Sequence, residues 1–255
     1  MAQFLVLQWF AHILSDFYFQ NDRMCKEKDE KGFASQALYI HSFIVFVMTV
    51  AFSVLSLFSF DFLGWAVFIA VTHLILDGLK HFMKGRSPLI VDGSKRYWKG
   101  CSSIFFIDQL IHWVVIAIVV YLFNESNPIV VQLWFPDTWL LVATLIFLIC
   151  LKPTNIMIKN VLTANLIGIS QLENKEELKN AGLLIGNLER TLTLILVVIG
   201  HYEVVGFIIA AKSILRFKES DTAKTEYVLV GTLLSYSVAL IGGLIIVYFK
   251  NGACG

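Results

Sequence analysis

Histidine and aspartate recur four residues apart at three places in the first half of this 255-residue sequence. The three motifs are His12-x-x-x-Asp16-x-x-x-Gln20, His73-x-x-x-Asp77-x-x-x-His81 and Asp108-Gln109-x-x-His112. Side chains four residues apart lie one above the other on an α-helix, so each motif predicts a polar stripe along one helix. A further histidine, His41, lies between the first and second motifs. Imidazole nitrogen combined with carboxylate oxygen is a ligand set for Zn²⁺, Mn²⁺ or Fe²⁺.

The elements that must position these residues are long apolar segments. The sequence is 57% hydrophobic and only 15% charged, with a mean hydropathy of +0.73. Soluble domains are about 45–50% apolar and about 25% charged, so this composition indicates a membrane protein and excludes a conventional soluble enzyme or a disordered chain. The net charge of +1 gives no basic surface for nucleic acid. The four cysteines are scattered and predict no disulfide framework or thiolate zinc site.

A transmembrane helix needs about 20 mostly apolar residues. We predict an all-α polytopic transmembrane helical bundle with about eight spans, at residues 2–20, 38–59, 61–83, 102–123, 130–151, 183–200, 203–217 and 226–249. The sixth and seventh segments are short and charged, and a re-entrant pair there would leave six spans. We expect a four-helix domain with the His/Asp motifs over residues 1–124 and a C-terminal membrane domain with four further helices over residues 125–255.

The distribution of lysine and arginine predicts the orientation. Of the 20 basic residues, 18 fall in segments 21–37, 80–101, 152–182 and 212–225. Basic residues are enriched on the cytoplasmic side, which predicts that both termini lie on the outer side of the membrane. In this topology all three motifs and His41 reach the same depth, in the cytoplasmic half of the bilayer.

Ionisable groups inside a membrane are costly and mark functional sites. We predict one or two divalent ions per chain, zinc first, with manganese or iron as alternatives. The predicted ligands are His12, Asp16, His41, His73, Asp77, Asp108 and His112. Gln20, His81 and Gln109 would orient them, and Asp16 or Asp77 would act as general base in catalysis. A proton or ion relay and a structural hydrogen-bond network stay open as alternatives.

The order and spacing of these residues resemble a family of bacterial membrane proteins known as domain of unknown function 3307, over residues 5–123. That family is itself similar to bacterial inner-membrane proteins described as metal-dependent hydrolases. The resemblance implies a metal site and hydrolysis, and it implicates the same seven ligands. His81 corresponds to no position that we can map, so its role depends on spacing alone.

Three basic residues of the second half lie within the sixth and seventh apolar segments. Arg190, Lys212 and Arg216 could bind an anion such as a phosphate headgroup, or they could form ion pairs and interfacial anchors.

From the motifs, the topology and the resemblance together, we expect a membrane hydrolase whose metal-activated hydroxide attacks an amphiphilic or lipid-linked phosphoester at the cytoplasmic leaflet, with membrane lipid as its partner. The competing functions are a metal-ion or proton-coupled transporter, and a non-catalytic membrane subunit or phage-defence effector.

Overall fold

The computed structural model describes the backbone of residues 1–57, 60–85, 89–92, 95–98, 101–127, 137–165, 181–216 and 222–252. Side chains are described for residues 1–57, 60–82, 104–127, 137–162, 182–214 and 228–252. Within these ranges the chain forms ten α-helices and one two-stranded sheet of β1 (Leu89–Asp92) and β2 (Lys95–Trp98). The chain divides into two compact units, residues 1–88 with 98–141 and residues 89–97 with 142–255. The predicted helical fold is confirmed.

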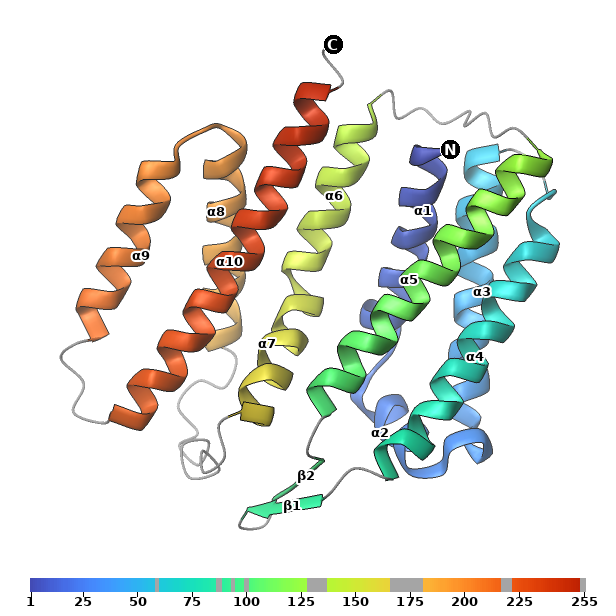
Figure 1. Cartoon of the computed structure of the whole chain (residues 1–255), viewed down its shortest axis with the longest axis horizontal. Coiled ribbons are helices and arrows are strands. Elements are labelled where there is room, and N and C mark those ends of the chain that lie inside the picture. The colour runs from blue at the N-terminus through green and yellow to red at the C-terminus, as the bar shows by residue number, and fades with distance from the viewer. Residues whose placement is uncertain are drawn as a thin grey trace. The chain divides into compact units, whose positions relative to one another are not determined.

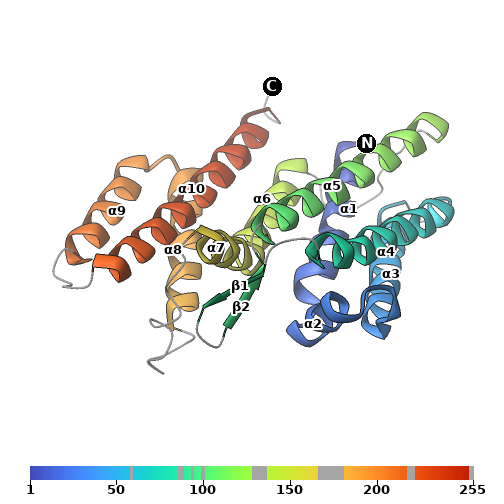
Figure 2. The ribbon, with the colours of Figure 1, turned by 60° about the horizontal axis from the view of Figure 1, so that its bottom comes forward.

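The first unit is a helical bundle. Its helices are α1 (Ala2–Ile13), α2 (Asp22–Lys31), α3 (Gln36–Leu57), α4 (Leu63–Gly85) and α5 (Cys101–Ser126). Figures 1 and 2 both show the short α2 beside α3 and α4 at one end of the bundle, away from the N-terminus. The other end has an aromatic core in which Phe62 lies 4.9 Å from both Phe4 and Phe123, measured between ring centroids. The polar motifs therefore occupy one half of the bundle and apolar residues the other.

Helix α3 has its polar residues inside and its apolar residues outside. His41, Thr49 and Ser53 are buried, whereas Phe43 and Leu55 are 65% and 57% exposed. A helix in a soluble protein has the opposite arrangement, because its apolar face lies against the core and its polar face meets water. Polar groups that face the bundle interior are typical of helices surrounded by lipid. The burial pattern thus indicates membrane association independently of composition.

Four helices are long and apolar enough to cross a membrane. They are Gln36–Leu57 in α3, Leu63–Phe82 in α4, Ile104–Ser126 in α5 and Val228–Gly252 in α10. A fifth span would form if α6 (Thr138–Cys150) and α7 (Lys152–Asn165), which are bent by 43°, act together. Pro153 explains the break, because proline cannot donate the backbone hydrogen bond that would continue α6. Over the described residues the structure therefore supports four or five spans, and eight spans are not confirmed.

A wide turn separates α1 from α2. Residues Leu14–Tyr18 form a π-helical turn, in which the Phe19 N–H donates to the Leu14 carbonyl over 2.9 Å. Such turns contain one residue more than an α-helical turn and often occur at functional sites. Asp16 is at the centre of this turn. Asn21 then begins α2 by accepting a hydrogen bond from the Met24 N–H at 2.9 Å.

Two glycines allow α2 and the segment after it to approach α4. Gly32 ends α2 with a φ of +53°, and a Cβ atom there would lie 2.9 Å from the His81 ring. A Cβ atom on Gly78 would lie 2.3 Å from the Phe33 ring. Because Gly78 follows Asp77, the packing of Phe33 brings α2 next to the second His/Asp motif.

We predict that Gly78→Ala lowers the stability of the folded bundle by about 1–3 kcal/mol, because Phe33 must move out of its place on α4. The measurement is the midpoint of thermal denaturation in detergent. Gly64→Ala is the matched control, since Gly64 is on the same helix and its Cβ atom would meet nothing within 4 Å. Equal midpoints for the two variants would show that Phe33 does not dock α2 on α4.

The second unit is built around α10 (Thr222–Gly252), the longest described helix. It packs against α7 and α8 (Ala181–Val198), and α8 also contacts α9 (Tyr202–Arg216). Val197, Val205 and Tyr236 form a small buried core between these helices. A Cβ atom on Gly243 would lie 2.6 Å from Val197, so a glycine is needed where α10 crosses α8.

Candidate metal centre

The seven predicted ligands come together in the first unit. His12 and Asp16 come from α1 and the turn after it, His41 from α3, His73 and Asp77 from α4, and Asp108 and His112 from α5. Each of the seven side chains is at most 7% exposed. They form three overlapping groups that could each hold a metal ion, with the possible ligand atoms of a group within 4.8 Å of one another. The groups are His12, Asp16 and His73; His41, His73 and Asp77; and Asp77, Asp108 and His112.

Three ligand atoms from three separate segments lie closest together. His41 Nε2 is 3.0 Å from His73 Nε2, and Asp16 Oδ1 lies 3.3 Å and 3.4 Å from these two nitrogens. Asp77 Oδ2 is next, at 3.7 Å from His41 Nε2 and 3.8 Å from His73 Nε2. All four atoms therefore converge on one point inside the bundle.

These separations match the ligand spacing around a single ion. Zinc binds nitrogen and oxygen at about 2.0–2.2 Å, so two ligands in a tetrahedral site are roughly 3.3 Å apart. The three closest atoms, at 3.0–3.4 Å, already have that spacing. Two histidines with two carboxylates are also a suitable donor set for zinc, manganese or iron. The residues present thus fit a divalent ion.

The two remaining histidines are oriented by hydrogen bonds from one ring nitrogen each. His112 Nδ1 lies 2.8 Å from the Asp108 carbonyl oxygen, and His12 Nε2 lies 3.3 Å from Gln109 Oε1. If these nitrogens donate, the opposite nitrogens are free to accept, and His112 Nε2 and His12 Nδ1 are indeed buried without a hydrogen bond to any described residue. A donor on one nitrogen and a bare lone pair on the other is the state of a metal-binding histidine.

Gln109 links the first motif to the third. Its Nε2 donates to Asp16 Oδ2 over 3.1 Å and to Asp108 Oδ2 over 3.3 Å, while its Oε1 faces His12. One amide therefore contacts three of the predicted ligands, which is the orienting position that the sequence predicts for it.

The other two predicted orienting residues lie farther from the histidines. When the Gln20 amide is oriented so that both its nitrogen and its oxygen have hydrogen-bond partners, the nitrogen donates to the Asp16 carbonyl oxygen over 3.2 Å and the oxygen accepts from Lys28. His81 Nδ1 lies 2.8 Å from the Asp29 carbonyl oxygen at the end of α2. His81 thus contacts the α2 backbone and is in none of the three metal-binding groups.

Two lysines that the sequence analysis missed contact the carboxylates. Lys28 of α2 forms an ion pair with Asp77 Oδ2, and Lys80 lies 2.6 Å from Asp77 Oδ1 and 2.7 Å from Asp108 Oδ2. Lys80 could have been found from its place three residues after Asp77, one turn along the helix. Lys28 carries no such signal, because the contact depends on how α2 folds back onto α4.

The predicted anion-binding residues of the second unit have other partners. Arg190 is 2% exposed and donates to Ser235, Asn155, Asn187 and the Cys150 carbonyl oxygen. Lys212 forms an ion pair with Glu189 at 2.5 Å. The side chain of Arg216 lies outside the described residues. Among these residues the structure therefore shows a buried arginine bound by neutral acceptors and a separate ion pair.

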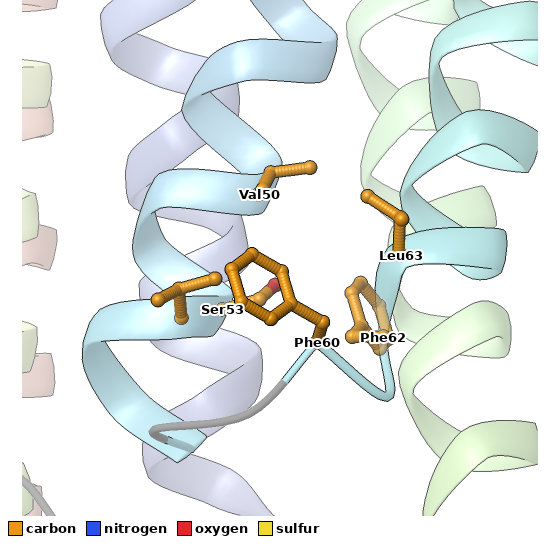
Figure 3. A pocket seen from close by; sticks show the side chains of 6 residues that line it. Val50, Ser53, Phe60, Phe62 and Leu63 are labelled. Atoms are coloured by element: carbon orange, nitrogen blue, oxygen red, sulfur yellow. The ribbon is translucent and has the colours of Figure 1, made fainter.

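A small pocket lies in the other half of the first unit. Val50, Ser53, Val54, Phe60, Phe62 and Leu63 line a shallow hollow between α3 and the start of α4 that has no room for an enclosed water molecule (Figure 3). Ser53 is 12 residues along α3 from His41, which corresponds to about 18 Å at 1.5 Å per residue. The pocket is therefore separate from the His/Asp cluster.

Residues 4–142 match the family described as a protein of unknown function, DUF3307. No curated protein and no solved structure matches the chain. All seven residues of the cluster, and both lysines that contact it, fall within the matched part.

Proposed function

The chain belongs to the DUF3307 family, and we propose that it is a membrane-embedded, metal-dependent hydrolase. One observation carries the proposal. Two imidazole nitrogens and one carboxylate oxygen, from three separate segments, lie 3.0–3.4 Å apart in a buried position. A purely structural network would be expected to fill each buried nitrogen with a hydrogen bond, because an unpaired buried polar atom costs about 1–3 kcal/mol. His12 Nδ1 and His112 Nε2 are such atoms.

The residues divide into binding and proton-accepting roles. His41, His73, Asp16 and Asp77 would hold the first ion, and His12, His112 and Asp108 would complete its shell or hold a second. Zinc is the first choice, with manganese or iron as alternatives. Such an ion supplies an activated water for hydrolysis. Of the two candidate bases, Asp16 would be the better proton acceptor where it keeps one oxygen off the ion, because both oxygens of Asp77 pair with lysines.

The surroundings favour an amphiphilic substrate. The cluster is enclosed by helices with apolar outer faces, so a lipid-linked ester, and first of all a phosphoester, would reach it most easily. The distribution of basic residues supports a cytoplasmic-leaflet site in an inner membrane with both termini outside. Eight spans fit this topology, and so do four or six, because an even number keeps both termini on the same side.

Elemental analysis of detergent-purified protein tests the proposal. We expect one or two equivalents of zinc, manganese or iron in the wild type and at least a tenfold loss in His73→Ala, because His73 belongs to two of the three metal-binding groups. His81→Ala is the matched control on the same helix and should keep its metal, since His81 is in none of the three metal-binding groups and its Nδ1 lies against the Asp29 carbonyl oxygen. A folded wild type without metal, even after reconstitution with divalent ions, would contradict the proposal.

A transporter is the second candidate, and the buried face of α3 favours it. Thr49, Ser53 and Ser56 continue the line of His41 towards the other end of the bundle, and Gln8 of α1 donates to Ser53 over 3.0 Å. However, Ser53 donates to the Thr49 carbonyl oxygen and Ser56 to the Ser53 carbonyl oxygen, so both hydroxyl protons are used within the helix. The stripe thus offers few free groups to a passing ion.

Ion flux in proteoliposomes separates the two candidates. We expect no zinc or proton flux above that of protein-free vesicles, because Phe4, Phe62 and Phe123 fill the far half of the bundle. Flux that falls at least tenfold in Ser53→Val, with metal content unchanged, would favour the transporter. Ser237→Val, which also removes a hydroxyl that donates within its own helix, is the control.

A further inference from the structure

Lys28 and Lys80 reach the cluster from the end of the bundle where α2 lies. Their side chains are 10% and 21% exposed, whereas the seven predicted ligands are at most 7% exposed. Each ammonium group has three N–H donors. Lys28 has two oxygen partners, on Asp77 and Gln20, and Lys80 forms two ion pairs, with Asp77 and Asp108. Within the described residues, one donor of each lysine is left.

The two lysines already bind an oxyanion between them. Lys28 contacts Oδ2 of Asp77 and Lys80 contacts Oδ1 of the same carboxylate. Two ammonium groups on two oxygens of one anion is also how lysines hold a phosphate group, through charge-assisted hydrogen bonds. The spacing of the two cations is therefore suited to a second oxyanion beside the first.

Charge balance points the same way. Three carboxylates face two ammonium groups, and with neutral imidazoles the cluster carries one net negative charge. A bound divalent ion would turn this into one net positive charge. The positive charge of the ion and the two lysines would then exceed the negative charge of the three carboxylates by one. A bound anion would restore neutrality.

We propose that Lys28 and Lys80 form an anion subsite that holds the phosphate group of the substrate beside the metal. The inference depends on the proposed function, because the positive excess requires the ion. It narrows the substrate to a phosphoester and makes both lysines positioning residues. The phosphate could be carried by a lipid or by a soluble molecule.

Phosphate binding to the metal-loaded protein tests the subsite. Metal content is measured first, and inorganic phosphate is then titrated into wild type, Lys28→Met and Lys80→Met by calorimetry. We expect each variant to bind phosphate at least about tenfold more weakly, the effect of losing one charge-assisted hydrogen bond. Lys26→Met is the control on the same helix, since Lys26 is 78% exposed and pairs with Glu30, and its affinity should not change. Lys28 lies on the peripheral α2, so its variant decides the question if Lys80→Met does not fold.

A second arm identifies the carrier. Nanodiscs of phosphatidylcholine with and without phosphatidic acid are compared for protein stability and for competition with phosphate. If phosphatidic acid competes with phosphate and this competition depends on the lysines, the result supports a lipid-linked phosphate. If phosphate binds and phosphatidic acid does not compete with it, the result supports a soluble ester. Variants with full metal content and unchanged affinity for both probes would overturn the subsite alone. A wild type that binds no metal would overturn the proposed function and the subsite with it.

Discussion

Asp77→Asn should abolish metal binding and also destabilise the metal-free protein by about 3–5 kcal/mol. The carboxylate of Asp77 belongs to two of the three metal-binding groups and is the shared partner of Lys28 and Lys80. Asparagine keeps the size of the side chain but removes its charge. Lys28 is then left without a carboxylate partner among the described residues, whereas Lys80 keeps Asp108 at 2.7 Å. An unpaired charge in such a largely buried position costs far more than the loss of an exposed ion pair.

A double variant separates the two effects. Asp77→Asn combined with Lys28→Met removes the cation that the single variant leaves unpaired, so a substantial part of the lost stability should return while metal binding stays absent. The measurements are the thermal denaturation midpoint in detergent with a chelator present and the metal content without it. A single variant as stable as wild type would mean that the lysines do not depend on Asp77. A double variant that binds metal normally would remove Asp77 from the centre.

Arg190→Ala should destabilise the second unit by about 3 kcal/mol or more, with the metal content of the folded fraction unchanged. The guanidinium joins α8 to the end of α6 through the Cys150 carbonyl oxygen, to α7 through Asn155 and to α10 through Ser235. Its removal leaves several buried acceptors without a donor. The cluster residues all belong to the first unit, so they lose no contact.

Arg190→Lys should restore little of this stability. A single ammonium nitrogen cannot reach acceptors on three other helices, whereas the planar guanidinium presents donors in several directions. Glu189→Gln is the matched control: its partner Lys212 is partly exposed, and losing that pair should cost about 1 kcal/mol or less. Thermal denaturation of all three variants gives the comparison. If lysine restores full stability, the network of hydrogen bonds is not what holds these helices together.

The convergence of the seven residues could be predicted because it depends on short-range rules. A spacing of four residues places histidine and aspartate on one face of a helix. Spans that alternate in direction across the membrane bring the motifs to one depth. Asp16 and His41 meet at 3.3 Å although 25 residues separate them. His41 has no aspartate four residues away, so its depth alone predicts its place in the cluster.

The partners of the basic residues could not be predicted in this way. Arg190 has neutral acceptors that come from other helices, and nothing in the sequence identifies Asn155 or Ser235 as its neighbours. Lys28 reaches Asp77 only because Phe33 packs over Gly78. The predicted span count also exceeds what the structure supports, because α1 has 12 residues and α9 has 15, fewer than the about 20 that a span needs.

The π-helical turn at Leu14–Tyr18 has a consequence for length changes in this part of the chain. One residue in an α-helix corresponds to a rotation of about 100°, so the additional residue in this turn sets the direction in which the chain leaves α1. A one-residue deletion there would restore α-helical geometry and rotate Gln20 and all of α2 about the helix axis, carrying Lys28 away from α4. Substitutions between Ile13 and Phe19 leave this direction unchanged, whereas insertions and deletions would change the side of the bundle on which α2 begins.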